Sequence, residues 1–94
     1  MQMPIENTNA NLPDFNTLQG AIFLMFKTFP NQSFTNDQIE KFVIQELNIS
    51  EIAQKIPREK SRTELQYQLA WARTKAKSAG LIIRDGSKCW RSNT

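Results

Sequence analysis

The chain has 94 residues, which is enough for one small domain with a single core and excludes a second domain. With 39% hydrophobic and 10% aromatic residues it holds enough apolar side chain for that core, so the composition excludes an intrinsically disordered chain. The formal net charge is +3, and the absence of His excludes imidazole metal sites and the usual general-base pairings.

Charge differs strongly between the two parts of the chain. Residues 1–54 hold two Lys and six acidic residues, a charge of −4, whereas residues 55–94 hold ten Lys or Arg and three acidic residues, a charge of +7. A basic part of this kind is typical of a surface that lies against a polyanion. Duplex DNA is therefore the leading candidate partner.

The first segment, residues 1–13, is polar and Asn-rich and carries two prolines, so we expect a flexible lead-in. A first helix is predicted from a cap at Asp14 or Asn16 to about Phe29, because Pro30 ends it. Its apolar stripe consists of residues at helical spacing, widened by further phenylalanines: Leu18, Ile22, Met25 and Phe29, with Phe15, Phe23 and Phe26.

A short extended link at Ser33 and Phe34 leads to the second predicted helix, from Asn36 to about Leu47 with Thr35 or Asn36 as its cap. The apolar face of this helix is Ile39, Phe42, Val43 and Leu47. Ser50 is then expected to cap a short turn over residues 51–56 that Pro57 stops, and a basic loop over residues 58–62 follows.

The third and longest helix is predicted from about Arg62 to Ala79, because Gly80 stands where a left-handed C-terminal cap is favoured. Its core-facing stripe is Leu65, Leu69, Ala72, Ala76 and Ala79. The opposite arc contains no acid, and its small central Ala70 lets the helix approach a groove closely. That layout is typical of a recognition helix, although an ordinary solvated face explains it equally well without further context.

Residues 81–91 supply the context, since Asp85-Gly86 joins two β-prone runs and predicts a hairpin. Three helices and a hairpin predict a mainly α fold of the winged helix-turn-helix class over residues 14–92. In that class the third helix enters the major groove and the hairpin, or wing, reaches the backbone or the adjacent minor groove. The predicted DNA contacts are Arg62, Thr63, Gln66, Tyr67, Arg73, Thr74 and Lys77 of the helix and Arg84, Lys88 and Arg91 of the wing.

The aromatic residues of this region are assigned separately. We expect Trp71 and Trp90 to pack in the core rather than stack on bases. Tyr67 remains divided between stacking against a base or meeting a phosphate and a partly exposed packing role.

A resemblance supports the same class. The runs Gln68–Thr74 (QLAWART), Ala79–Ile82 (AGLI) and Cys89–Arg91 (CWR), with Gly86 in the turn, resemble the N-terminal domain of Mrr-type restriction proteins. The resemblance covers the last third of the chain. It implies a winged-helix DNA-specificity module of a restriction or DNA-defence protein, usually followed by a separate nuclease domain.

Catalysis is not predicted. The acid-x-Lys spacing of the accompanying nuclease is absent, the three Gly form no phosphate loop, and the single Cys89 builds neither a zinc site nor an internal disulfide. We therefore expect no enzyme activity, no cofactor and no metal. We also expect no membrane contact and a cytoplasmic location, with any nuclease domain in another part of the protein or on another chain.

A second interpretation belongs to a different functional class. The same fold serves there as a protein-interaction or dimerisation module without DNA contact, through the Phe-rich first helix or exposed Trp faces. DNA binding weakens steeply with salt, whereas an apolar docking surface is far less salt-sensitive. The target sequence, any modified base, a homodimer and continuation past Thr94 stay open at this point.

Overall fold

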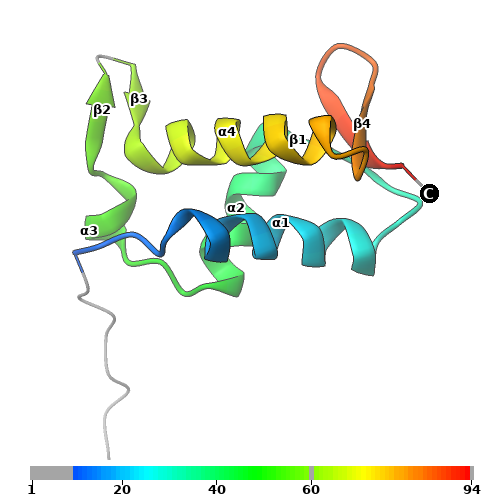
Figure 1. The fold of residues 1–94 in the computed structure, drawn as a ribbon. Helices are drawn as coiled ribbons and strands as arrows, with labels where there is room; N and C mark the ends of the chain where they lie inside the picture. The colour runs from blue at the N-terminus through cyan, green and yellow to red at the C-terminus, as the bar shows by residue number, and fades with distance from the viewer. Residues whose placement is uncertain (1–9, 60, 94) are drawn as a thin grey trace, which may run out of the picture.

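The computed structural model describes residues 10–59 and 61–93, and these form four helices and five short strands (Figure 1). The expected mainly α fold with a C-terminal hairpin is confirmed at this level. In chain order the elements are α1 (Phe15–Thr28), β1 (Ser33–Thr35), α2 (Asn36–Glu46), α3 (Glu51–Gln54), β2 (Pro57–Glu59), β3 (Arg62–Thr63), α4 (Glu64–Ser78), β4 (Ile82–Asp85) and β5 (Cys89–Ser92).

Each helix begins at a side chain that accepts a hydrogen bond from a free backbone N–H of the first turn. Asp14 accepts from the Thr17 N–H at 2.8 Å, and this bond lowers the pKa of the Asp14 carboxyl. Thr35 caps α2, and Ser50 caps α3 by accepting from the Ala53 N–H at 3.1 Å. The capping residues anticipated for these three helices are therefore confirmed.

The end of α4 is a Schellman motif around Gly80, which has a φ of +76°. The Leu81 N–H donates to the Ala76 carbonyl and the Gly80 N–H to the Lys77 carbonyl, each at 3.0 Å. This left-handed cap is the one predicted at Gly80. It turns the chain directly from α4 into β4.

Two antiparallel sheets form. The C-terminal hairpin, β4–β5, turns through Gly86 at a φ of +77° and is extended by β1, so that the strand order is β1-β5-β4. The extended link at Ser33 and Phe34 is thus a strand, with Phe34 opposite Trp90. The basic loop expected over residues 58–62 is instead a second hairpin, β2–β3, called here the middle hairpin.

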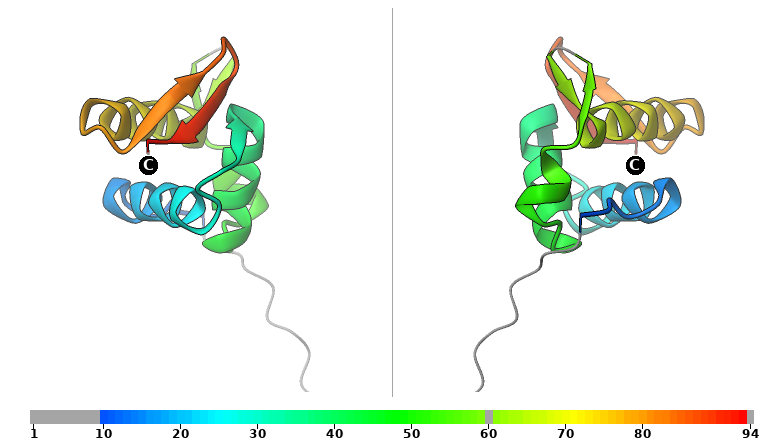
Figure 2. Two further views of the ribbon diagram at one scale, coloured as in Figure 1. Left: turned by 90° about the vertical axis from the view of Figure 1, so that its right-hand side faces the viewer. Right: turned by 90° about the vertical axis from the view of Figure 1, so that its left-hand side faces the viewer.

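The core lies between α1, α2 and α4 and is closed by the β1-β5-β4 sheet. Figure 1 shows α1 running below α4, and Figure 2 shows α2 standing upright beside that pair. The largest fully buried side chains come from all of these layers: Leu18, Ile22, Ile39, Val43, Leu65, Leu69 and Ile82. Phe29 and Ala79, expected in the stripes, are exposed because each lies at the C-cap, beyond the last turn of its helix.

The lead-in expected over residues 1–13 falls largely outside the described residues, which begin at Ala10. Within the described part, Leu12 packs against the core just before α1. The described residues include no helix with the length and apolarity that a membrane crossing requires.

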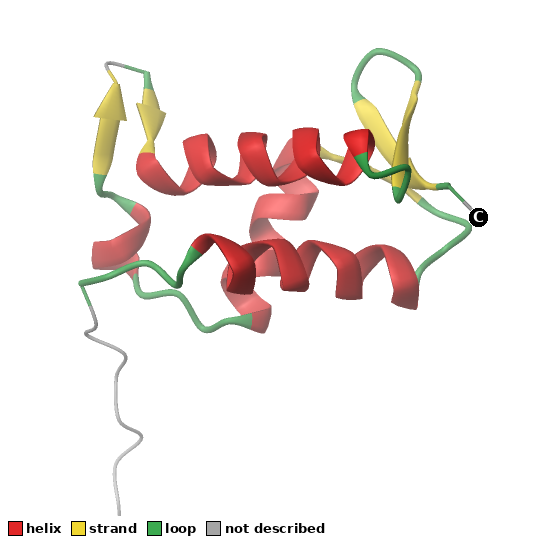
Figure 3. Cartoon of the chain, viewed as in Figure 1, coloured by secondary structure: helices red, strands yellow, loops and turns green. Residues whose placement is uncertain are grey.

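The two hairpins stand at opposite ends of α4 and project to the same side, away from α1 (Figures 1 and 3). The middle hairpin precedes the first turn of α4, and the C-terminal hairpin follows its last turn. The face of α4 that points away from α1 is therefore framed by a hairpin at each end.

Candidate nucleic-acid interface

The buried face of α4 is the one predicted from its periodicity. Leu65, Leu69, Ala72 and Ala76 are buried, and α1 packs along them. Trp71 does not join this core, because it lies on the other side of the helix and is 52% exposed. The expectation of a core role for Trp71 is therefore wrong, whereas Trp90, only 8% exposed, does pack in the core.

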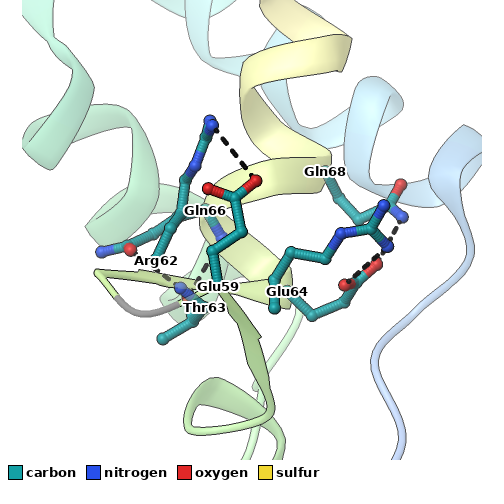
Figure 4. Close-up of polar contacts among 7 residues, drawn as sticks. Glu59, Arg62, Thr63, Glu64, Gln66 and Gln68 are labelled. Atoms are coloured by element: carbon teal, nitrogen blue, oxygen red, sulfur yellow. Dashed lines mark hydrogen bonds and ion pairs between the residues drawn. The ribbon is translucent and has the colours of Figure 1, made fainter.

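Two of the predicted contact residues have a structural task at the start of α4 (Figure 4). The Gln66 N–H donates to Thr63 Oγ1 at 3.2 Å, and the Thr63 N–H donates to Gln66 Oε1 at 3.1 Å. This reciprocal capping box satisfies two backbone donors of the helix start. Thr63 and Gln66 are therefore engaged in holding the helix, and both are half-buried.

Arg73 is half-buried rather than fully on the solvent side. Burial of its guanidinium lowers the pKa of Arg73, the carboxylate of Glu40 raises it, and the charges of Arg84 and Arg62 lower it further. An arginine stays charged under such shifts, so Arg73 is a partly buried cation near the Glu40 carboxylate of α2. Arg62 and Arg84, from two other elements, are thus close enough for their charges to act on Arg73.

A polar hollow of about 260 Å³ lies between α4 and the start of α2. It is lined by Asn36, Asp37, Glu40, Ser61, Arg62, Gln66 and Arg73. A second hollow, of about 370 Å³, lies between the C-terminal hairpin and the start of α2, and it shares Asn36 and Asp37 with the first. Because they share these residues, the two hollows are adjacent and connect α4 to the hairpin.

Arg84 and Lys88 line the second hollow, and both are exposed. The Arg84 guanidinium lies 4.6 Å from the centre of the Trp90 ring, and its Nη2 donates to the Ser87 carbonyl at 2.7 Å. These contacts orient the cation at the hairpin turn. Arg91 is directed elsewhere, because it pairs with Asp85 at 3.9 Å and is half-buried.

The middle hairpin places arginines around the aromatic residues of α4. The Arg58 guanidinium lies 3.9 Å above the Tyr67 ring and 3.4 Å from the Glu64 carboxylate, and Arg62 lies 5.7 Å from the same ring. Tyr67 in turn meets Trp71 edge to face, with ring centres 6.4 Å apart. Tyr67 is therefore a packing residue, which fits one of its two expected roles.

A third hollow, of about 320 Å³, opens beside this aromatic pair. It is lined by Arg62, Tyr67, Ala70, Trp71 and Thr74. Thr74 belongs to the predicted contact set, and its Oγ1 donates to the Ala70 carbonyl at 2.9 Å. Lys77 is exposed further along α4 and lines none of the three hollows.

Sequence reasoning missed two residues of this surface, Arg58 and Trp71. Nothing local to Arg58 indicated its stack on Tyr67, because the two meet only when the middle hairpin folds onto α4. Trp71 is not part of the core-facing stripe predicted from Leu65, Leu69, Ala72 and Ala76, and this absence was the available signal of its exposure. Within residues 10–59 and 61–93, no group of three potential metal ligands gathers.

No family model, no curated protein and no solved structure matches this chain. The resemblance to the Mrr-type N-terminal domain therefore stays a prediction.

Proposed function

We propose that this chain is a winged helix-turn-helix domain that binds duplex DNA. α4 is the recognition helix in the major groove, and the C-terminal hairpin is the wing on the backbone or the adjacent minor groove. The arrangement that supports this is a core of three longer helices with an antiparallel hairpin directly after the third. In keeping with the resemblance, the domain is the specificity module of a restriction or DNA-defence protein whose nuclease domain lies elsewhere.

One observation carries the proposal. Arg62, Arg73 and Arg84 come from the middle hairpin, from α4 and from the C-terminal hairpin, and they line two adjacent hollows in which the charges of Arg62 and Arg84 act on Arg73. Like charges repel, so a polyanion that neutralises them is favoured at this surface. Phosphates of a duplex that crosses α4 between the two hairpins supply that neutralisation.

Asp37 and Glu40 moderate this positive surface. They line the polar hollow together with Arg62 and Arg73, so part of the cationic charge is already balanced within the protein. We therefore expect modest affinity for DNA of arbitrary sequence. Discrimination between DNA sequences then depends on which base edges α4 contacts in the major groove.

The test is a fluorescence-anisotropy titration with a short duplex at about 50 mM and about 200 mM salt. The wild-type chain should bind, and binding should weaken steeply at the higher salt. Arg84→Ala and Lys77→Ala should each weaken binding and reduce the salt slope by about one unit. Arg73→Ala is a less clean probe, because the half-buried side chain also contributes to the fold.

The matched control is Lys27→Ala, which removes an exposed cation of α1 that lines neither of the two polar hollows. It should leave binding unchanged. If Lys27→Ala weakened binding as much as Arg84→Ala, the proposed face would be wrong. Absence of any duplex binding at about 50 mM salt would exclude the function itself.

A second candidate function, a protein-interaction or dimerisation module, is favoured by a different surface. An apolar hollow of about 340 Å³ lies between the C-terminal half of α1 and the start of β4. It is lined by Phe23, Phe26, Lys27, Pro30, Leu81, Ile82 and Ser92. Sedimentation of the wild type and of Leu81→Asp tests it: self-association that resists salt and is lost in the variant would support this function.

A further inference from the structure

We propose that the exposed face of α4 reads the C5-methyl group of thymine in the major groove, in the hollow beside Trp71. The proposal rests on the DNA-binding function above and names the base that α4 contacts. The hollow is lined by Arg62 of the middle hairpin and by four residues of α4. These four are Tyr67, Ala70, Trp71 and Thr74, and their spacing places them along one side of the helix.

The chemistry of the hollow is mainly apolar. Tyr67 and Trp71 contribute rings, and Ala70 contributes a methyl group. The hydroxyl of Thr74 is engaged by the Ala70 carbonyl at 2.9 Å, so Thr74 offers its methyl group as the remaining contact. The small side chains at Ala70 and Thr74 leave room beside the two rings.

Folding does not account for the exposure of Trp71. Trp71 is 52% exposed, although a buried indole would contribute far more to stability. Its ring is nevertheless oriented, because it meets Tyr67 edge to face and Arg58 covers the Tyr67 ring at 3.9 Å. A large apolar ring kept exposed and oriented is typical of a binding site.

The surrounding charge identifies the ligand. Arg62 lines the hollow and Arg58 lies over the Tyr67 ring beside it, so the occupant has an apolar contact point next to negative charge. Thymidine in a duplex offers both, since its C5-methyl group projects into the major groove beside the phosphate backbone. Thymine is the unmodified base that presents such a methyl group there, and apolar side chains read it.

The experiment compares an alternating A·T duplex with the same duplex in which deoxyuridine replaces thymidine. Deoxyuridine pairs identically and lacks only the methyl group, and an alternating duplex presents a methyl group in every register. Removing the methyl groups should weaken wild-type binding about fourfold for each methyl contacted, the equivalent of about 0.8 kcal/mol. Trp71→Ala should abolish this difference while the salt dependence of binding remains.

Two variants serve as controls. Leu24→Ala removes another exposed apolar side chain, on α1, and should leave the difference between the two duplexes unchanged. Trp71→Phe retains an aromatic ring and should retain part of the difference. Thermal unfolding should show Trp71→Ala folded like the wild type, because half of this side chain is already in water.

The outcomes separate this proposal from the function on which it rests. Equal binding of the two duplexes, still weakened by salt, would overturn methyl reading and leave DNA binding intact. Equal loss of affinity for both duplexes in Trp71→Ala would also overturn it. Tighter binding of single-stranded thymidine oligomers that depends on Trp71 would show stacking on unpaired bases instead. No binding of either duplex at low salt would overturn both proposals.

Discussion

The two hairpins at the ends of α4 are built in different ways. The C-terminal hairpin has two four-residue strands, is joined by β1 and places Ile82 and Trp90 in the core. The middle hairpin has strands of three and two residues with an irregular register, and every residue of β2 is exposed. One hairpin is therefore part of the core, whereas the other lies on the surface of α4.

The contacts of the middle hairpin explain how it stays in place. Arg58 stacks on Tyr67 and pairs with Glu64, Arg62 pairs with Glu59 at 3.8 Å, and the Glu64 N–H donates to the Ile56 carbonyl at 2.8 Å. Exposed ion pairs and cation–π contacts are each worth only about 1 kcal/mol or less. We therefore expect the C-terminal hairpin to open only with the whole domain and the middle hairpin to open locally.

The largest effect is expected for Trp90→Ala. It empties a core position and removes the bond from Nε1 to Asn36 Oδ1 at 2.9 Å, so the free energy of unfolding should fall by about 3 to 5 kcal/mol. The matched substitution Trp71→Ala should cost less, about 1 to 1.5 kcal/mol, since about half of that side chain is already in water. Urea denaturation measures both. Similar losses for the two tryptophans would contradict the difference in burial.

Gly86→Ala should give the next largest effect. Gly86 has a φ of +77°, which costs an alanine about 1 to 2 kcal/mol, so the C-terminal hairpin and the domain should both be destabilised. Gly20→Ala is the matched control, because Gly20 lies inside α1 and an added Cβ meets nothing within 4 Å. That change should stabilise by about 0.5 to 1 kcal/mol. Thermal denaturation should therefore show shifts of opposite sign.

Arg58→Ala should affect the middle hairpin more than the domain. Global stability should fall by about 0.5 to 1 kcal/mol, while amide protons of the middle hairpin should lose their protection from hydrogen exchange. Arg58→Lys keeps the charge and loses the planar guanidinium, so it should recover only part of that protection. If amides of β4 and β5 lost protection equally, the two hairpins would form one cooperative unit after all.

Glu40→Gln should give the smallest effect, a rise of about two- to threefold in affinity for duplex DNA. The substitution removes the negative charge that acts on Arg73 and so strengthens the positive surface between the two hairpins. Glu46→Gln, at the far end of α2, removes the same charge outside the hollows and serves as the control. Equal gains for both variants would mean that only net charge matters.

Sequence reasoning succeeded where a few neighbouring residues decide the structure. Asp14, Thr35 and Ser50 cap their own helices, Gly80 ends α4 and Gly86 turns the C-terminal hairpin. Helical periodicity also placed most of the buried faces correctly. Each of these interactions spans only one or two turns of chain, so a short window of sequence contains everything that determines it.

The candidate site was predicted less completely. The DNA contacts predicted from the sequence include Arg62, Tyr67 and Thr74, which line the third hollow. They do not include Arg58 or Trp71. The orientation of the exposed face of α4 depends on where α1 packs, and a helix wheel gives that orientation only approximately. The half-burial of Arg73 likewise depends on α2, which lies beside α4 only in the folded molecule.

The amino-acid sequence by itself determined where α1 and α2 start, where α4 ends, that a hairpin follows the longest helix, and that positive charge gathers in the last forty residues. The start predicted for the longest helix, about Arg62, was wrong, because Arg62 and Thr63 form β3 and α4 starts at Glu64. Only the tertiary structure decided that β1 joins this hairpin, that a second hairpin stands at the other end of α4, and that Trp71 faces solvent. The physical reason is distance along the chain. Trp90 and Asn36, for example, are bonded across 54 residues, and no local pattern specifies which distant partner a strand or a side chain meets.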